Sequence, residues 1–308
     1  MNKNSPILIA ELGATNARLD IIQDNQSLSK KTNYLMEEYD SVESIFEDFL
    51  TKTGIKTKRA IMGVAAPVLE DQVQFVNINI KFSQNELRKK MFKDQLIVLN
   101  DLELQAYAIE TLKKKDVLPI GTRKKQLEGS RILVCPGTGL GLAGIVEGNV
   151  KATEAGHLHI PSNLSTIYSI VEGYEREHNR MPSFEDLLSG KGLNFIYCFL
   201  TNSPSTPYSN EEILSETKDP DCLKTKKLML CLLAVFLRYM ALIWGATGGV
   251  YVSGSMANSL ILNSNSQDFR SNFEGKGQMK IFLINTPLFL ILDDNLGLRG
   301  ALKIASNC

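Results

Sequence analysis

The sequence predicts an α/β protein of two domains, and three observations favour this fold class. Short apolar segments of strand length occur together with a segment that has the spacing of an amphipathic helix. Two strand–turn–strand units with glycine-rich tips lie about 125 residues apart, which suggests a structural duplication without a detectable sequence repeat. The chain has 308 residues, enough for two packed domains.

The first strand–turn–strand unit lies near the N-terminus. Residues 7–10 and 17–22 have strand character, and residues 13–16, which we call the first tip, form the turn between them. The next apolar residues recur at helical spacing, namely Val42, Ile45, Phe46, Phe49 and Leu50. The capping-box pattern Asp40-x-x-Glu43 accompanies them, so we expect an amphipathic helix over 41–53.

Two short apolar runs follow, at 60–65 and 96–99, and they are expected to be strands buried on both faces. The second run ends at Asn100-Asp101. Because sites on parallel sheets lie outside the carboxyl ends of the strands, Asn100 and Asp101 are candidate functional residues. The alternative is that they only cap a helix over 102–114.

The second unit repeats the first. Strands are expected at 131–135 and 142–146, with the glycine-rich residues 136–141 between them, which we call the second tip. Further on, 201–221 are expected to form a surface loop, and 223–245 a long buried helix. Residues 281–284 and 288–292 are expected to be strands, and 297–305 a closing helix.

Composition and charge exclude several classes of protein. With 44% hydrophobic and 22% charged residues the chain is neither disordered nor fibrous. Its 34 basic and 34 acidic side chains give zero formal charge, so no overall field attracts nucleic acid or an anionic membrane. The five cysteines form no C-x-x-C pair and fit reduced thiols, and no export signal is visible. We therefore expect a cytoplasmic protein without a nucleic-acid or membrane partner.

A formal G-x-G-x-x-G pattern begins in the second tip and runs from Gly139 to Gly144. Its context differs from that of a dinucleotide-binding site. Such a site needs a helix after the last glycine, and a turn at Gly148-Asn149 leaves no room for one. The chain also lacks the P-loop pattern and the protein-kinase motifs. The two tips are therefore candidates for holding phosphate oxygens by backbone N–H groups, and the alternative is two ordinary tight turns.

Seven motifs, in this order and spacing, resemble those of bacterial glucokinases over essentially the whole chain. They are Glu11-Leu-Gly-Ala-Thr-Asn-Ala-Arg-Leu19, Leu99-Asn-Asp101, Cys135-Pro-Gly-Thr-Gly-Leu-Gly141, Glu154-Ala-Gly-His157, Leu188-Ser-Gly-Lys-Gly-Leu193, Gly248-Gly-Val-Tyr-Val-Ser-Gly254 and Asp294-Asn-Leu-Gly-Leu298. Those enzymes belong to the superfamily of hexokinase, actin and the Hsp70 ATPase domain. The resemblance implies a two-domain actin-like ATPase (ribonuclease H-like) fold with ATP in an interdomain cleft. It places 1–108 with the C-terminal helix 295–308 in a small domain and 109–294 in a large one.

The resemblance also implies roles for particular residues. Asp101 would be the catalytic base in ATP-dependent phosphorylation of a hexose, most simply glucose to glucose 6-phosphate, because a hydroxyl needs a nearby carboxylate to take its proton. The remaining sugar hydroxyls would be bound by Asn100, Glu154, His157 and Glu185. The nucleotide would be bound by Gly13, Thr15, Asn16, Gly137, Thr138, Gly139 and Gly254. Glu11 would orient Mg²⁺, the partners would be a sugar and a nucleotide, and a homodimer is one assembly that the sequence leaves open.

The first tip departs from the family pattern. Bacterial glucokinases usually read Asp-x-Gly-Gly-Thr-Asn, whereas this chain has Glu11 and Ala14. The resemblance also implies that the segment 248–254 holds the adenosine, and after it Ser255 replaces the expected second glycine. Unless both changes are harmless drift in a loop that tolerates them, the longer acid would misplace Mg²⁺, and Ala14 adds a Cβ where the backbone must approach phosphate closely and where a positive φ would favour glycine. Two alternatives therefore stay open: a sugar-binding pseudokinase or an enzyme with altered phosphoryl chemistry, and a sugar-responsive regulator. Against the regulator, the chain starts on its first strand without a helix-turn-helix, and it lacks a zinc-type cysteine cluster.

Overall fold

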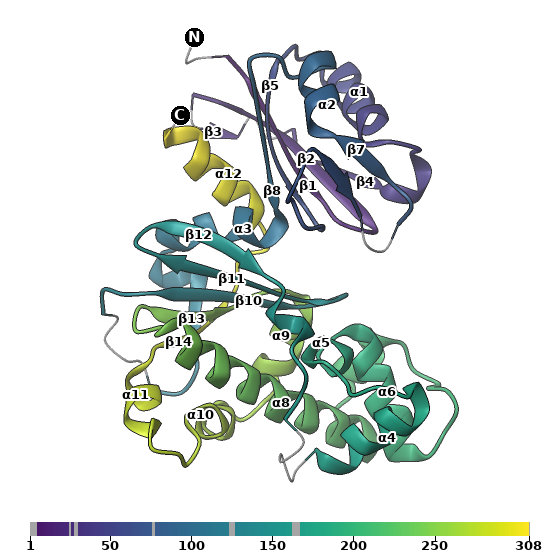
Figure 1. The fold of residues 1–308 in the computed structure, drawn as a ribbon, viewed down its shortest axis with the longest axis vertical. Helices are drawn as coiled ribbons and strands as arrows, with labels where there is room; N and C mark the ends of the chain where they lie inside the picture. Colours follow the sequence, from purple (N-terminus) through teal and green to yellow (C-terminus); the bar gives the residue numbers. More distant parts are fainter. Residues whose placement is uncertain are drawn as a thin grey trace. The chain divides into compact units, whose positions relative to one another are not determined.

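The computed structural model describes residues 5–24, 26–27, 30–75, 78–122, 127–161 and 167–307. The chain divides into two compact units (Figure 1). Unit 1 comprises Met1–Leu112 and Asn295–Cys308, and unit 2 comprises Lys113–Asp294. The chain therefore leaves unit 1 after Leu112 and returns to it after Asp294.

Unit 1 is built on a mixed sheet with the strand order β3-β2-β1-β5-β8, and β4 pairs with β2. Strand β1 pairs antiparallel with β2 and parallel with β5, which in turn is parallel to β8. The strands are β1 (Ile7–Leu12), β2 (Asn16–Gln23), β3 (Gln26–Ser27), β4 (Thr32–Leu35), β5 (Arg59–Val64) and β8 (Gln95–Asn100). A separate small hairpin consists of β6 (Gln72–Gln74) and β7 (Lys81–Ser83). The predicted first hairpin and both predicted strands are therefore confirmed.

Alternate residues of β1 enter two different cores. Leu8 and Ala10 pack with Phe46 of α1 (Val42–Thr53), and the same core continues toward α2 (Gln84–Lys90). Ile7 and Ile9 pack with α3 (Asp101–Ala106) and with the closing helix α12 (Leu296–Asn307). The two faces of the sheet are thus covered by different helices, as the period of a strand requires.

Three details of unit 1 differ from the sequence prediction. Ser41, not Asp40, caps α1, because its hydroxyl accepts the N–H of Ser44 at 3.2 Å. Strand β8 is at the sheet edge and is only half-buried from residue 97 on, so the prediction of burial on both faces was wrong for it. The helix predicted over 102–114 ends as α3 at Ala106 and continues only as a 3₁₀ turn, Tyr107–Thr111.

Unit 2 repeats the sheet pattern of unit 1. Its strand order is β12-β11-β10-β13-β14-β9, in which β10 pairs antiparallel with β11 and parallel with β13. The strands are β9 (Val117–Pro119), β10 (Arg131–Pro136), β11 (Leu140–Val146), β12 (Asn149–Thr153), β13 (Gly249–Val252) and β14 (Leu288–Ile291). The hairpin β1–β2 with β5 and β8 corresponds to β10–β11 with β13 and β14, so the expected duplication is present in the topology.

The longest helix of unit 2, α8 (Pro220–Trp244), is the predicted buried helix. Asp219 caps it by accepting the N–H groups of Asp221 and Cys222, and Gly245 ends it with φ 55°. It is long and apolar enough to cross a membrane by length and composition alone, but it contributes residues such as Leu233 to the core of unit 2. The other helices are α4 (Tyr168–His178), α5 (Phe184–Leu187), α6 (Gly190–Thr201), α7 (Asn210–Ser215), α9 (Ser255–Leu262), α10 (Ser266–Glu274) and α11 (Lys280–Asn285).

Two predictions in unit 2 were wrong. The segment 201–221 contains α7, because Ser209 and Glu212 form a capping box and Ile213 is buried. The segment 281–284 lies in α11 and is not a strand. Arg270 stabilises the end of this helix, since its guanidinium donates to the carbonyl oxygens of Leu283 and Thr286. An apolar run of four residues does not by itself distinguish strand from helix.

Candidate functional site

The first tip leaves two backbone donors available. The N–H of Gly13 donates to the carbonyl of Asn16 at 2.9 Å, which closes the turn between β1 and β2. Within the described part of the chain, the N–H groups of Ala14 and Thr15 have no hydrogen-bond partner. Thr15 and Asn16 are exposed. Two adjacent free N–H groups at a turn form an anion-binding concavity.

Ala14 causes no backbone strain at this tip. It is absent from the described residues with positive φ, so the expectation of a left-handed residue at 14 was wrong. Gly13 is the tighter position, because a Cβ there would lie 3.1 Å from the carbonyl oxygen of Asn16. The tip therefore tolerates Ala14 while it keeps its two free donors.

The carboxylate of Glu11 is half-buried near the end of β1, beside Arg18 on β2. It accepts the backbone N–H of Gly297, the second residue of α12. Burial raises the pKa of Glu11, while Arg18, Lys31 and the Gly297 N–H act in the opposite direction. A Cβ at 297 would lie 1.7 Å from Oε1 of Glu11, so only glycine fits there without a shift. This pairing joins residues 286 positions apart and was not predicted from the sequence.

Asn100 and Asp101 lie on the same sheet edge as the first tip. Leu12 pairs with Val64, and Val64 pairs with Asn100, so the parallel strands β1, β5 and β8 end side by side. This is the edge at which parallel α/β sheets bind ligands.

Asn100 caps α3, as the structural alternative proposed. Its Oδ1 accepts the N–H of Leu102 at 2.9 Å, and its amide donates to the carbonyl of Ala66 at 3.3 Å. Asp101 is the first residue of α3, and its Oδ1 also lies 2.9 Å from the N–H of Leu102. The positive end of the helix dipole therefore stabilises negative charge on Asp101.

Gly63 on β5 determines how closely α3 approaches the sheet. A Cβ at 63 would lie 3.2 Å from Cα of Asp101 and 2.8 Å from Cδ2 of Leu104. The absence of a side chain at this position lets the helix that carries Asp101 pack directly on the strand. This supporting glycine was not identified from the sequence.

The second tip has the same construction as the first. The N–H of Gly137 donates to the carbonyl of Gly139 at 2.8 Å, and the N–H of Gly190, at the start of α6, donates to the carbonyl of Gly137 at 2.9 Å. Among the described residues, the N–H groups of Thr138 and Gly139 find no hydrogen-bond partner. The N-terminus of a helix next to free N–H groups favours an anion.

Gly254 lies beside the strand that leads to the second tip. It has φ 99°, and a Cβ there would lie 2.9 Å from Sγ of Cys135 and 3.3 Å from the carbonyl oxygen of Pro136. Ser255, the residue at the departure from the family pattern, is the first residue of α9.

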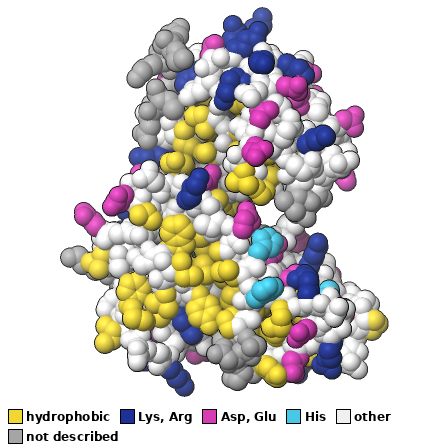
Figure 2. Space-filling view, in the orientation of Figure 1, with side chains coloured by type: hydrophobic (Ala, Val, Ile, Leu, Met, Phe, Trp, Pro, Cys, Tyr) yellow, Lys and Arg dark blue, Asp and Glu magenta, His cyan; other side chains and the backbone are white. Residues whose placement is uncertain are grey.

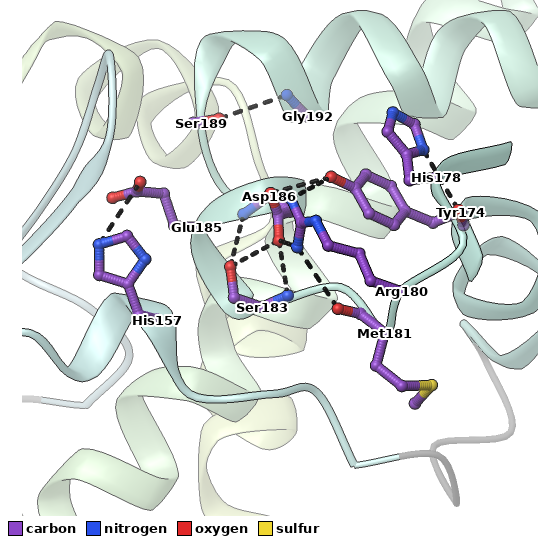
Figure 3. A network of polar contacts seen from close by, with 10 residues as sticks. All are labelled: His157, Tyr174, His178, Arg180, Met181, Ser183, Glu185, Asp186, Ser189 and Gly192. Atoms are coloured by element: carbon purple, nitrogen blue, oxygen red, sulfur yellow. Dashed lines mark hydrogen bonds and ion pairs between the residues drawn. The ribbon is translucent and has the colours of Figure 1, made fainter. Parts of the chain in front are cut away.

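Three predicted site residues of unit 2 come together, and we call them the acid–histidine cluster: Glu154, His157 and Glu185. Nε2 of His157 lies 3.8 Å from Oε2 of Glu154. The same nitrogen lies 3.9 Å from Oε1 of Glu185 (Figure 3). The His157 and Glu154 side chains are 60% and 66% exposed, and histidine and acidic side chains lie next to one another on the face in Figure 2. The cluster therefore offers several acceptors to a polar ligand.

Asp186, next to Glu185, fixes the short helix α5. Its carboxylate accepts from both terminal nitrogens of Arg180 at 2.7 Å, from the hydroxyl of Tyr174 at 2.9 Å, and from the N–H and hydroxyl of Ser183 (Figure 3). Although burial acts in the opposite direction, these hydrogen bonds hold the pKa of Asp186 well below its usual range. Burial and the bond to Asp186 raise the pKa of Tyr174 to about 12. The sequence analysis missed this network, whose only local sign is the Ser183-x-x-Asp186 capping pattern.

No group of three or more histidine, cysteine, aspartate or glutamate side chains suited to a metal occurs among the residues that the structure describes. Glu11 is a single carboxylate, one that accepts the Gly297 N–H. A carboxylate keeps further acceptor sites when one hydrogen bond is made, and Mg²⁺ at phosphate sites is commonly held by one or two carboxylates together with phosphate oxygens. Glu11 therefore fits a magnesium ion that a nucleotide brings with it.

Comparisons with known sequences and structures cover nearly the whole chain, and those described next are all with glucokinases. The sequence model of the Glucokinase family matches residues 8–308. A glucokinase of Tolumonas auensis is 32% identical, with 96% of this chain and 95% of the relative covered, and one of Neisseria meningitidis (strain MC58) is 29% identical over 98% and 95%. The crystal structure of a glucokinase from an Antarctic psychrotroph is 26% identical, covers 99% of both chains and has a TM-score of 0.81. A ROK family glucokinase from Streptomyces griseus in complex with glucose and AMPPNP is 15% identical, covers 99% and 100%, and shares the fold with a TM-score of 0.65.

The duplicated sheets, together with structural neighbours that are glucokinases, identify the actin-like ATPase fold of the sugar kinases. The enzyme class is that of the hexose kinases, which transfer a phosphoryl group to a sugar hydroxyl. Within this class, the chain belongs to the Glucokinase family.

Proposed function

We propose that this kinase transfers the γ-phosphoryl group of ATP to the 6-hydroxyl of glucose and that Asp101 is the general base. The observation that carries the proposal is the position of Asp101. It is the first residue of α3, at the carboxyl end of β8. The strand β1 ends at the same sheet edge, and the first tip follows it there. A rigid carboxylate beside a phosphate-binding turn suits phosphoryl transfer, which depends mainly on positioning and charge.

The two tips would hold the phosphates of the nucleotide. The donors at the first tip are the N–H groups of Ala14 and Thr15, and at the second tip those of Thr138 and Gly139. The S. griseus relative, whose fold this chain shares, is in complex with AMPPNP, which supports an adenine nucleotide as the donor. Mg²⁺ bound by Glu11 and phosphate oxygens would neutralise charge on the transferred group.

The acid–histidine cluster and Asn100 would bind the sugar hydroxyls. A polyol needs paired donors and acceptors, and a site that bonds each hydroxyl rejects analogues that lack one. Glu154 and Glu185 supply acceptors within 4 Å of the His157 ring. Glucose is the proposed sugar because the Balamuthia mandrillaris glucokinase and the S. griseus enzyme, which share the fold, are both in complex with glucose.

In the proposed reaction, the Asp101 carboxylate takes the proton of the 6-hydroxyl. The oxygen then forms a bond to the γ-phosphorus while the bond from this phosphorus to the β,γ-bridging oxygen breaks, so that ADP leaves with that electron pair. The products are glucose 6-phosphate, ADP and the proton on Asp101.

One observation favours the alternative of altered phosphoryl chemistry. The longer Glu11 side chain bonds the backbone of α12 at Gly297, which reduces its freedom to follow a metal ion. The other ground for the alternative is weaker, because Ala14 is not in the left-handed region. The retained Asp101 favours the kinase.

The proposal is tested by measuring ADP formation with ATP and Mg²⁺ across a panel of hexoses, with sugar affinity measured by calorimetry in parallel. We expect turnover to be highest with glucose. Glucose binding without ADP formation would favour the pseudokinase, and higher turnover with another hexose would reassign the substrate.

A further inference from the structure

Glu185 contacts two different parts of unit 2 with its two carboxylate oxygens. Oε1 lies 3.9 Å from Nε2 of His157, within the acid–histidine cluster (Figure 3). Oε2 accepts the backbone N–H of Leu140, which follows the free donors of the second tip, at 2.8 Å. A Cβ on Gly139 would lie 2.6 Å from Oε2, so the glycine at this position makes room for the carboxylate. Glu185 is thus the side chain that joins the cluster to the second tip.

The backbone of Leu140 depends on this contact. Leu140 is buried, and among the described contacts its N–H donates to Oε2 of Glu185. A buried N–H without an acceptor costs about 1–3 kcal/mol in typical proteins. On its other side, the carbonyl oxygen of Leu140 would lie 2.3 Å from a Cβ on Gly156, in the turn between Glu154 and His157. Both backbone groups of Leu140 therefore contact elements that carry cluster residues.

The helix α5, which carries Glu185, is fixed by the hydrogen bonds of the next residue, Asp186. Asp186 receives five hydrogen bonds from Tyr174, Arg180 and Ser183, so α5 has little freedom to rotate. The backbone that carries Glu185 is therefore fixed next to both of its contacts, the His157 ring and the Leu140 N–H.

We propose that Glu185 couples the sugar to the nucleotide: a hydroxyl bound at Oε1 orders the Glu185 carboxylate and, through the Leu140 N–H, the donors of the second tip. This inference rests on the proposed function, which places sugar at the acid–histidine cluster and phosphate at the second tip. Because coupling between two sites is reciprocal, glucose should tighten ADP binding, and ADP should tighten glucose binding by the same factor.

The test uses calorimetric affinities of the full chain for glucose alone, for Mg·ADP alone and for Mg·ADP with saturating glucose. Wild type should bind ADP about threefold or more tightly with glucose than without it. Glu185→Ala removes both contacts, so ADP alone should bind about threefold to tenfold more weakly and the effect of glucose should disappear. Glu185→Gln retains an oxygen that can accept the Leu140 N–H, so ADP affinity without glucose should return to within about twofold of wild type.

Glu154→Ala is the matched control, because Glu154 lies as close to His157 as Glu185 does but has no hydrogen bond to Leu140 among the described contacts. It should weaken glucose binding and leave ADP binding without glucose unchanged. The coupling is wrong if Glu185→Ala binds ADP as wild type does, or if Glu154→Ala and Glu185→Ala weaken it equally. Unchanged glucose affinity in all three variants would instead overturn the sugar assignment on which the inference rests. If Glu185→Ala does not fold, loss of the glucose effect in Glu185→Gln, with ADP affinity retained, supports the coupling, and an unaltered glucose effect overturns it.

Discussion

Replacement of Gly297 by alanine is expected to displace the carboxylate at the end of β1. A Cβ at 297 would lie 1.7 Å from Oε1 and 2.1 Å from Cδ of Glu11. Non-bonded heavy atoms in favourable contact are about 3.5–4.0 Å apart, so Glu11 or α12 must shift by more than about 1 Å. The shift would break the hydrogen bond from the Gly297 N–H to Glu11.

The expected cost combines two effects. Overpacking of this kind typically costs about 1–3 kcal/mol, and a hydrogen bond to a charged acceptor contributes about 1.5–3 kcal/mol. Because the Glu11 side chain can partly move toward solvent, we expect a loss of about 3 kcal/mol in the free energy of unfolding. Glu11→Asp shortens the acid by one methylene, which withdraws it from the new Cβ. The double variant should therefore be more stable than the sum of the single effects by at least about 1 kcal/mol.

Calorimetric melting temperatures of wild type, Gly297→Ala, Glu11→Asp and the double variant measure this coupling between residues 11 and 297. Gly277→Ala is the control, because a Cβ at that glycine meets no atom within 4 Å and its φ is not positive. For chains of this size a loss of about 3 kcal/mol corresponds to a fall of roughly 6–12 °C. The reasoning is refuted if Gly297→Ala melts with the control, or if the two single effects simply add.

Three further outcomes follow from the site. Asp101→Asn should lose nearly all turnover while the glucose dissociation constant stays within about tenfold, as kinetics and calorimetry can check; substantial remaining turnover would remove Asp101 from the role of base. Ala14→Gly should leave turnover nearly unchanged and lower stability by about 0.5–1 kcal/mol in urea titrations, because Ala14 is already unstrained; a large gain in turnover would show that its Cβ obstructs the phosphate. Since the pKa of Asp186 is lowered in the folded state, it contributes stability above its ordinary pKa of about 4, and this contribution is lost as the pH falls toward the folded value. Asp186→Asn should therefore make the melting temperature depend less on pH between about pH 4 and pH 2. The same fall in melting temperature over this range in wild type and variant would contradict this.

Local sequence patterns predicted the central strands of both sheets and three of the helices. Alternation of apolar segments and glycine turns was enough to predict both hairpins and the strands at 59–64 and 95–100. Helical spacing was enough to predict α1, and a long apolar stretch was enough to predict α8. Short apolar runs were ambiguous, so residues 281–284 were assigned to a strand although they lie in α11. Periodicity needs several turns or strand residues to distinguish the two periods, and four residues are too few.

The sequence also named candidate residues for the site, because ordered motifs specify residue types and spacing. Glu154 and His157 were named from a motif and Glu185 from the family resemblance, and the structure brings the carboxylates of Glu154 and Glu185 within 4 Å of the His157 ring. The assignment of Asp101 as the base still awaits its experimental test. What the motifs conveyed was identity and order along the chain, not contacts.

Only the tertiary structure decided which groups each of these side chains contacts. Glu11 meets Gly297 because α12, at the far end of the chain, packs on the sheet of unit 1. Glu185 accepts the N–H of Leu140 because α5 lies against the second tip. The Asp186 carboxylate accepts hydrogen bonds from Arg180 and Tyr174, which lie on neighbouring segments. Contacts between distant segments arise from packing of whole elements, and a local pattern carries no information about which distant N–H a carboxylate will accept. The sequence by itself therefore determined the elements and the candidate residues, and the packing of helices on the two sheets determined their partners.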